Sequence, residues 1–468
     1  MKRILRHLLF SFLALLPIHA VAAEEESVKT ISLWQCFRVE ETAVFREIMD
    51  DFVADYEKRH GERIKVNMQY VSFDDMFTKL RTAALANITP DVAFIDSIKV
   101  TDLAFGKALT PLDDLPSFKE RYGTKEKAAP EFVAAAFDAG LVERLGEKKL
   151  YALPVQTTTI ALFWNKDMFK AKERELRAAN LDPTRAPQDW DELYAYGRIL
   201  TDPKQKVSAF AFSSSLWFTF GVFNMYDVKF IEYDEQGRAR PSLDNKNGIA
   251  AASRLQWIAN SGIEGGGWQR GSLGPDPMFL NRRVAMILTG PWNTENFANA
   301  GLNFDVSLVP APTRKEIKEL GLQPLDPEED PNSAAAFSSS NIGGQSGVIL
   351  RTCKYPDIAF EMMDYFTSEA VQRRWASQLG QIPVRRAAWK NLDTTKYPFM
   401  KAFMRQLAKS KRIPQVPLYA NLENDVYNPQ VDLLLNKQIT PEAMVKRMED
   451  VMNRVIISKI NITPDEKK

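Results

Sequence analysis

A tryptophan placed just after the end of a strand is the feature of this sequence that most directly suggests a chemistry. The apolar run at residues 284–288 leads into Gly290 and Pro291, which end sheet pairing because proline lacks a ladder donor and glycine permits unusual backbone angles. Trp292, followed by Asn293, is then presented at the mouth of a sheet. There an indole can stack on the C–H face of a sugar while polar groups bind its hydroxyls. An indole that caps the core is the competing interpretation.

Histidine use argues against several kinds of catalytic site. Two of the three histidines, His7 and His19, lie in an N-terminal segment that we expect to be removed. The third, His60, falls in the last turn of a predicted helix, where it can hydrogen-bond terminal carbonyls. A Ser-His-Asp triad, a Cys-His pair and multi-histidine metal sites are then hard to build. The glycines at 265–267 and 343–344 have the wrong spacing for a phosphate cradle. The sequence predicts no catalytic residue, no metal and no cofactor.

A pair of carboxylates is the remaining route to catalysis. Asp74, Asp96 and Asp276 could supply acids to a secreted glycosidase, which needs two carboxyls across a bound sugar and no histidine. Nothing in the sequence marks two of them as a pair. A glycosidase is therefore the alternative to a protein that only binds.

The N-terminus has the form of a cleavable secretory signal at residues 1–23. A basic start and an apolar run at 8–18 precede small residues that end in Ala22 and Ala23. The run is too short to span a bilayer, and no cysteine stands at the expected cut. These features predict a soluble periplasmic protein.

Cleavage after residue 23 would leave 445 of the 468 residues, which is too many for one core and suits two lobes. It would remove three of the 61 cations and none of the 60 acids, so 58 cations remain. This near balance gives no electrostatic reason to bind nucleic acid or membranes, although a local charge in a pocket would escape the count. Nine tryptophans suit a ligand groove.

The two cysteines, Cys36 and Cys353, follow predicted strands that we place in the same lobe. In an oxidising compartment they could form a disulfide, or both could remain buried free thiols.

Strands and helices alternate in the N-terminal part. Strands are predicted at 30–34, 64–71 and 91–95, separated by helices whose apolar residues recur at three- and four-residue steps. This order predicts an α/β lobe with a largely parallel sheet, whose ligands gather at the carboxyl ends of strands. The loops there contain Gln35, Phe37, Phe73, Asp96 and Ser97.

The rest of the chain supplies further elements. Two extended runs within 151–165 are separated by the polar residues 156–158, and Asp189 with Glu192 predicts a capping box. Residues 311–341 are predicted to be a long loop, either a lid or a mobile insert. Other predicted elements are strands at 304–310 and 343–350, a helix at 359–375 and a final helix opening at 440–442.

Several landmarks stand in a fixed order: residues 90–96, 151–154, 163–167, 190–193, 290–292, 343–344 and 381–384. In this order the sequence resembles the extracellular solute-binding proteins of sugar ABC importers, the family 1 group that includes maltose-binding protein. The resemblance covers nearly the whole mature chain. It implies a two-lobe periplasmic-binding-protein-like fold of type II, with the ligand cleft between the lobes. The first lobe would comprise 24–156 and 343–395, and the second 157–342 and 396–468.

The resemblance also implies a function and a site. The protein would be a monomeric, non-catalytic module that captures a small neutral carbohydrate, mono- to oligosaccharide, by clamp closure and delivers it to ABC permease subunits. Trp292 matches the residue after the Gly-Pro pair, and Trp217 offers a second stacking platform or core packing. The residues that the resemblance places near the cleft are Trp34, Gln35, Phe37, Phe73, Asp96, Ser97, Gln156, Trp217, Trp292, Asn293, Gly343 and Gly344.

Overall fold

The computed structural model describes residues 28–144, 147–236, 238–325, 329–390, 392–414, 416 and 418–460. The signal peptide predicted at residues 1–23 lies outside this range. Within it, no helix combines the length and the apolar character needed to cross a membrane.

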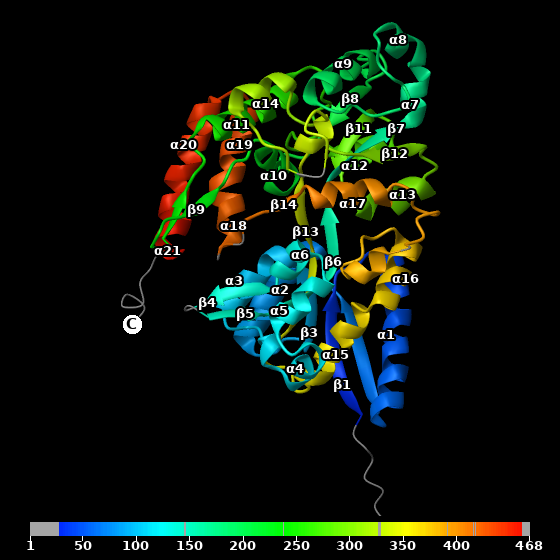
Figure 1. The fold of residues 1–468 in the computed structure, drawn as a ribbon, viewed down its shortest axis with the longest axis vertical. Coiled ribbons are helices and arrows are strands. Elements are labelled where there is room, and N and C mark those ends of the chain that lie inside the picture. The colour runs from blue at the N-terminus through cyan, green and yellow to red at the C-terminus, as the bar shows by residue number, and fades with distance from the viewer. Residues whose placement is uncertain are drawn as a thin grey trace, which may run out of the picture.

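The first of two main sheets forms the lower part of the molecule in Figure 1. Its strand order is β14-β13-β3-β1-β2, and β6 also pairs with β13. The β1–β2 and β1–β3 pairs are parallel, as predicted for these three strands, and β13–β14 is parallel too. The sheet also contains antiparallel pairs, because β13 runs antiparallel to both β3 and β6. The strands are β1 (Lys29–Gln35), β2 (Ile64–Tyr70), β3 (Val92–Asp96), β6 (Ala152–Thr159), β13 (Asn341–Ile349) and β14 (Lys411–Arg412).

The second main sheet lies in the upper part, in the order β12-β7-β11-β8. Its strands are β7 (Ala161–Asn165), β8 (Ser208–Ala211), β11 (Val284–Thr289) and β12 (Phe304–Ser307). Two hairpins are separate from both main sheets. They pair β4 (Leu141–Arg144) with β5 (Glu147–Leu150), and β9 (Ile231–Tyr233) with β10 (Ala239–Pro241). We call the parts around the first and second sheets the first and second lobes. The chain passes between them at Ile160, where β6 gives way to β7, and again where β13 begins.

Helices cover the sheet of the first lobe. Along α1, the buried residues Phe45, Ile48, Met49 and Phe52 follow the helical period and pack toward β1 and β3, which confirms the predicted amphipathic helix. The helices of this lobe are α1 (Val39–His60), α2 (Phe73–Ala86), α3 (Val100–Phe105), α4 (Pro116–Tyr122), α5 (Lys125–Ala128), α6 (Ala134–Asp138), α15 (Pro356–Phe366) and α16 (Glu369–Leu379).

Two groups of helices cover the second lobe. The first group is α7 (Lys166–Ala171), α8 (Glu173–Ala178), α9 (Trp190–Leu200), α10 (Leu216–Met225), α11 (Lys246–Asn260), α12 (Pro275–Leu280), α13 (Thr294–Asn299), α14 (Arg314–Leu320) and α17 (Met400–Ala408). The C-terminal group is α18 (Tyr419–Asn421), α19 (Asn428–Leu435), α20 (Pro441–Met452) and α21 (Ser458–Ile460), joined by π-helical turns. Met444 and Met448 of α20 share a core with Leu255 of α11.

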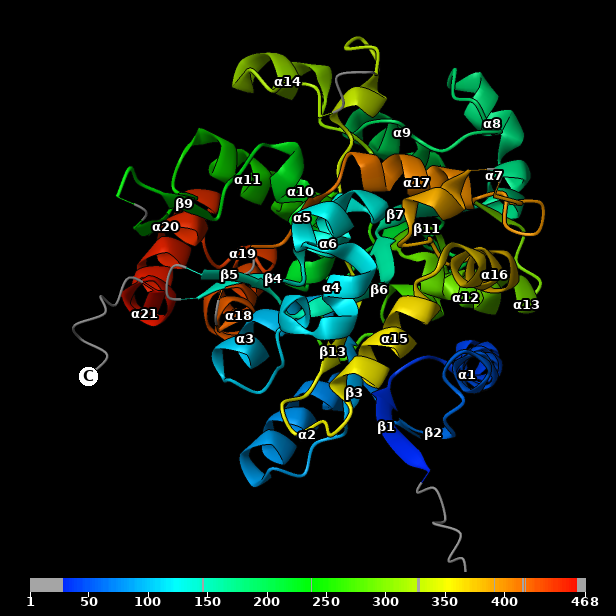
Figure 2. The same cartoon turned by 60° about the horizontal axis from the view of Figure 1, so that its bottom comes forward.

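The C-terminal group also approaches the first lobe. In both views, α18 lies beside α3 and the β4–β5 hairpin (Figures 1 and 2). The amide of Leu418 donates to Asp102 of α3 over 2.6 Å. The two lobes are therefore in contact at the C-terminal group as well as at the crossing strands.

The segment at 311–341 differs from the predicted loop. Its Thr313 and Glu316 form a capping box that starts α14, and Glu316 accepts hydrogen bonds of 2.6 Å from Tyr226 and from Arg254. Because α14 is tied to α10 and α11 at the upper end of Figure 1, the prediction of a lid was wrong. Ser338 and Ser339, near the end of the segment, are buried before β13 begins.

Three local predictions also need correction. The strand β6 continues through residues 156–158, and the break falls at Ile160 instead. The helix predicted at 359–375 is two helices, because α15 ends at Phe366 and Ser368 stands at the N-cap of α16. Asp189 caps α9 as expected, but Glu192 binds Arg185 and the amide of Gln188 instead of reaching back to Asp189.

Both cysteines are free. Cys36 is buried and its thiol lies 3.3 Å from Oε1 of Gln345, while Cys353 is partly buried. Burial raises the pKa of each thiol to about 12, so both are protonated at neutral pH.

Candidate functional site

Trp292 stands where the sequence predicts it, at the end of a strand. The strand β11 ends at Thr289, and a single 3-10 turn at Pro291–Asn293 follows. The indole is partly buried, and its edge meets the ring of Phe218 at a centroid distance of 6.4 Å and an angle of 76°. Packing from behind therefore holds the ring at the boundary between the lobes.

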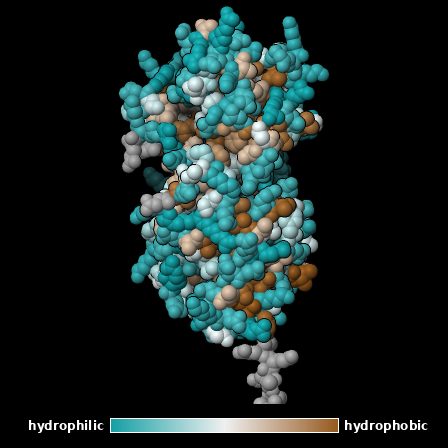
Figure 3. All heavy atoms as spheres, turned by 90° about the vertical axis from the view of Figure 1, so that its right-hand side faces the viewer, coloured by the Kyte–Doolittle hydropathy of each residue, from teal (hydrophilic) through white to brown (hydrophobic). Residues whose placement is uncertain are grey.

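A cavity of about 300 Å³ adjoins Trp292 and is lined from both lobes. The second lobe contributes Pro291, Trp292, Glu295, Asn296 and Asn299, and the first contributes Arg38, Glu40, Glu41, Leu379 and Gln381. Most of these side chains are polar. On the face drawn in Figure 3, hydrophilic side chains predominate, and hydrophobic side chains gather at the waist and in the lower half. We call this cavity the interlobe cavity.

Hydrogen bonds cross the lobe boundary beside the interlobe cavity. Nη1 of Arg38 donates to the carbonyl of Trp292 over 2.9 Å and to Oδ1 of Asn293 over 3.3 Å. Nδ2 of Asn293 donates to Asp276 over 2.5 Å and to Thr289 over 2.9 Å. Burial raises the pKa of Asp276, although the hydrogen bonds from Asn293 and Thr289 oppose this. Asn293 is thus occupied by protein partners.

A second set of hydrogen bonds joins the crossing strands to the same cavity. Nε2 of Gln156 donates to Gln381 over 2.9 Å, and Nε2 of Gln381 donates to Glu41 over 2.9 Å. The other Glu41 oxygen accepts the amide of Arg38, also over 2.9 Å. Burial raises the pKa of Glu41. A movement at Gln156 would therefore reach the start of α1 through two side chains.

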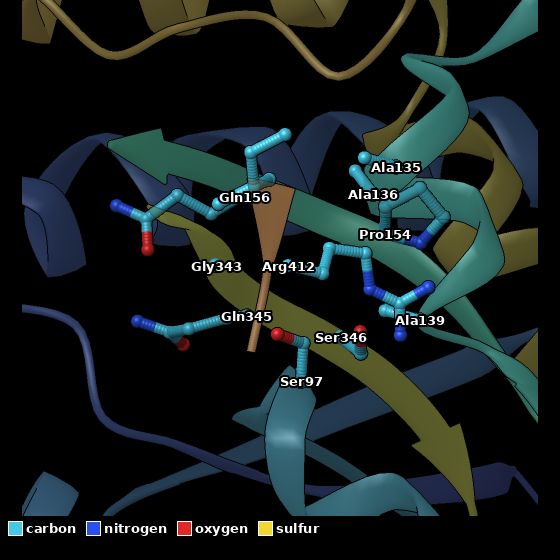
Figure 4. A pocket seen from close by; sticks show the side chains of 11 residues that line it. Ser97, Ala135, Ala136, Ala139, Pro154, Gln156, Gly343, Gln345, Ser346 and Arg412 are labelled. Carbon is cyan, nitrogen blue, oxygen red and sulfur yellow. The ribbon is translucent and has the colours of Figure 1, made fainter. Parts of the chain in front are cut away.

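A smaller cavity lies at the crossing strands, and we call it the hinge cavity (Figure 4). Its volume is about 10 Å³, roughly the space of one water molecule. It brings together Ser97, Gln156 and Gly343, three residues predicted to lie near the cleft. Ser346 and Arg412 line it too.

The two glycines of β13 make room for protein atoms. A Cβ at Gly343 would lie 2.2 Å from the Trp217 ring, so the missing side chain lets this indole lie on the strand. At Gly344, φ is +135° and a Cβ would lie 2.0 Å from the carbonyl oxygen of Gln156. Trp217 therefore packs between α10 and β13, which is the core interpretation of this residue.

Three residues at the end of the first strand have partners within the protein. Phe37 is 1% exposed, with its ring centroid 5.1 Å from that of Phe45 and 5.0 Å from that of Trp375. Gln35 is also buried, and its Oε1 accepts the amide of Phe37 over 2.6 Å. Trp34 packs partly buried against the cluster that includes Ile95. In this structure, core packing and the turn after β1 use Phe37, Gln35 and Trp34, so their role as ligand contacts stays a prediction.

Asp96 and Phe73 have different surroundings. Asp96 ends β3 and its Oδ1 accepts the amide of Ile98 over 3.1 Å, which is the N-cap role. Burial raises its pKa and so favours the neutral acid. Phe73, the first residue of α2, is 51% exposed and lines neither of the two cavities.

Sequence reasoning missed Arg38, Glu41 and Arg412. Glu41 stands three residues after Arg38, which is the spacing of a capping box at the start of a helix. This spacing could have identified Glu41 as the acceptor of the Arg38 amide. No local signal places Arg412 beside the crossing strands, because its neighbour Ile342 is 70 positions earlier in the chain.

The chain matches the family model described as bacterial extracellular solute-binding protein over residues 40–373. A galactooligosaccharide-binding protein of Bacillus subtilis is 23% identical over 406 residues, covering 86% of this chain and 83% of the relative. Maltodextrin-binding protein MdxE of the same species is also 23% identical, over 82% of this chain and 81% of the relative.

Solved structures share the fold. The GacH receptor of Streptomyces glaucescens has a TM-score of 0.71 at 20% identity, covering 92% of this chain and 98% of that one. A cyclo/maltodextrin-binding protein complexed with maltotetraose has a TM-score of 0.69 at 17% identity, covering 94% and 99%. The predicted two-lobe, maltose-binding-protein-like α/β fold is thereby confirmed.

Proposed function

The chain belongs to the bacterial extracellular solute-binding proteins, and on that premise we propose that it captures a carbohydrate, from mono- to oligosaccharide, and delivers it to an ABC permease. The interlobe cavity carries the proposal, because Trp292 borders a space of about 300 Å³ that both lobes line with polar groups. Stacking on an indole and hydrogen bonds to hydroxyls are the interactions that sugars need. The names of the two relatives, which refer to galactooligosaccharide and maltodextrin, support this ligand class.

The lobes would close on the ligand by moving about the crossing strands. In this proposal the first lobe comprises 24–156 and 343–395, and the second 157–342 and 396–468. The separate clusters around Trp375 and around Trp190 support this division. A ligand that binds the closed arrangement better than the open one shifts the equilibrium by its difference in affinity. A dissociation constant near 1 μM, about −8 kcal/mol, suits cargo that must be released.

We propose Trp292, Ser97, Gln156 and the backbone of Gly343 as ligand contacts; that these residues line the two cavities supports this. The mature protein would act in the periplasm as a monomer after removal of residues 1–23. It would bind without catalysis. Incubation with labelled oligosaccharides should therefore release no new reducing ends, and steady turnover would favour the glycosidase instead.

A thermal-shift screen tests the ligand class. Galactooligosaccharides, maltodextrins, acidic oligosaccharides and monosaccharides are compared with amino acids and short peptides at equal concentration. A ligand that binds only the native state raises the melting temperature by mass action. We expect at least one saccharide to raise it and the amino acids and peptides to leave it unchanged. A rise caused by peptides alone would contradict the proposal.

A further inference from the structure

The hinge cavity contains a positive charge that no residue of the described chain neutralises. Arg412 of β14 lies beside Ile342 of β13 and extends its guanidinium into this cavity (Figure 4). Within the described chain, Arg412 has no side-chain hydrogen bond and no ion pair. Among the described residues, Asp138 is the acid whose charge acts on Arg412, and Asp138 is exposed on α6. Burial lowers the pKa of Arg412 to about 10, so the group is charged at neutral pH despite its loss of solvation.

Arg412 is partly buried, and two fully buried cations of the described chain show what accompanies a charge away from solvent. Arg385 is 3% exposed and binds Glu131 over 2.5 Å and Asp364 over 3.2 Å. Lys409 is 2% exposed and binds Glu329 over 2.7 Å. Buried charges are normally paired, because desolvation without a partner is strongly unfavourable. Arg412, partly buried at the crossing strands, has no such partner among the described residues.

The cavity wall offers further unused hydrogen-bonding capacity. Ser346 is 1% exposed, and its Oγ has no hydrogen-bond partner. The hydroxyl of Ser97, which is 7% exposed, lines the same space from the end of β3. None of the residues that line the cavity is acidic. Buried polar atoms in native proteins are rarely left unpaired, so an unpaired hydroxyl beside an unpaired guanidinium indicates a missing acceptor.

We propose that Arg412, Ser346 and Ser97 bind the carboxylate of an acidic carbohydrate, so that the cargo is a uronic acid or an oligosaccharide that contains one. This inference rests on the proposed function and specifies its substrate class. It also departs from the neutral sugar expected from the sequence. The net charge of the chain is nearly balanced and therefore does not reveal the local positive charge of Arg412.

A carboxylate fits this site better than other anions. Its two oxygens match the fork of a guanidinium, and its single charge matches the single cation. A doubly charged phosphate monoester would retain excess charge here. The volume of about 10 Å³ admits one water-sized group, so the acid must enter as the lobes part and be enclosed as they close. The position between Ser97, Gln156 and Gly343 makes the site continuous with the predicted cleft.

Calorimetry with matched pairs of sugars tests the proposal. Each probe is a uronic acid mono-, di- or trisaccharide, compared with the same sugar after reduction of its carboxyl to a primary alcohol. Sulfated and phosphorylated neutral sugars form the third arm. We expect at least one acid to bind about 10- to 100-fold more tightly than its reduced form, the range of a hydrogen-bonded charge pair. Arg412→Gln should remove most of that preference.

Lys411→Gln is the matched control, because Lys411 is the neighbouring cation of the same strand but is exposed and pairs with Asp227 over 3.1 Å. The control should retain the preference for the acid. Ser346→Ala should reduce it by a smaller factor. The melting temperature without ligand gives a second readout, since Arg412→Gln removes an unpaired charge and should leave the protein equally or more stable.

The outcomes separate this inference from the proposed function. Equal affinity for acid and reduced sugar, or an unchanged preference in Arg412→Gln, would overturn the acidic ligand while leaving a carbohydrate-binding protein. A preference for sulfate or phosphate over carboxylate would also overturn it. A marked loss of stability in Arg412→Gln would show that Arg412 is structural. Failure of every saccharide to bind would overturn both proposals.

Discussion

The guanidinium of Arg38 donates a 2.9 Å hydrogen bond to the main-chain carbonyl of Trp292, and this contact spans the two lobes. It joins the start of α1 to the turn that presents the proposed stacking ring. The same guanidinium reaches Asn293, which is itself fixed by Asp276 and Thr289. The position of Trp292 is therefore coupled to the relative position of the lobes.

Removal of this contact should loosen the turn after β11. In Arg38→Ala we expect faster amide hydrogen exchange at residues 290–299 in the ligand-free protein, because their link to the first lobe is lost. Arg46→Ala is the control, since Arg46 is exposed on the same helix. Unchanged exchange in Arg38→Ala, or an equal increase in both variants, would contradict a role for this hydrogen bond.

Truncation of Trp292 should weaken sugar binding. We expect Trp292→Ala to lower the affinity by about 1–3 kcal/mol, measured by calorimetry, through loss of stacking and of water exclusion. Trp257→Ala is the comparison, because Trp257 packs against Tyr194 and Arg254 and lines neither cavity. An unchanged affinity in folded Trp292→Ala, or an equal loss in both, would remove Trp292 from the site.

The elements that the sequence predicts well are those with local causes. The helix at Val39–His60 follows from the spacing of Phe45, Ile48 and Phe52, and Gly61 ends it with a φ of 69°. The position of Trp292 follows from the Gly-Pro pair before it. In each case neighbouring residues determine the backbone, so a short window contains the required information.

The parts of the site that the sequence does not predict depend on contacts between distant segments. Phe37 follows the first strand like a cleft residue, but Phe366 and Trp375, more than 300 positions later, draw it into the core. Arg412 reaches the hinge cavity only because β14 pairs with β13. No window of sequence contains both partners of either contact.

Gly344, at the crossing strands, should not tolerate a side chain. In Gly344→Ala the new Cβ would lie 2.0 Å from the carbonyl oxygen of Gln156, so the strands must separate, and the positive φ adds strain. We expect the stability to fall by more than about 3 kcal/mol. Gly262→Ala is the control, because Gly262 has a φ of +80° and its added Cβ would meet nothing within 4 Å. It therefore measures the cost of the positive φ alone, about 1 kcal/mol of stability. Equal melting temperatures for the two variants would contradict the close approach at Gly344.

The carboxyl of Glu264 should make stability depend on pH. Burial raises its pKa from 4.5 to about 7, although the amides of Gly266 and Gly267 donate to it over 2.6 and 3.0 Å. A carboxyl whose pKa is higher in the folded state than in the unfolded state binds its proton more tightly when the protein is folded. The resulting stabilisation is complete at pH values below the unfolded-state pKa, and it is lost as the pH rises through the folded-state pKa. Between pH 4.5 and 7 the wild type should therefore lose stability relative to Glu264→Gln, by on the order of 3 kcal/mol at most. Parallel curves of unfolding free energy against pH would contradict the assignment.

The two lobes should close on a bound sugar, and small-angle X-ray scattering measures that closure directly. The radius of gyration is compared without ligand and at saturation with the saccharide that gives the largest thermal shift, with a non-binding saccharide at equal concentration as the control. We predict a smaller radius only with the binding saccharide, because a ligand that contacts both lobes favours their closed arrangement. Identical radii at proven saturation would contradict the clamp.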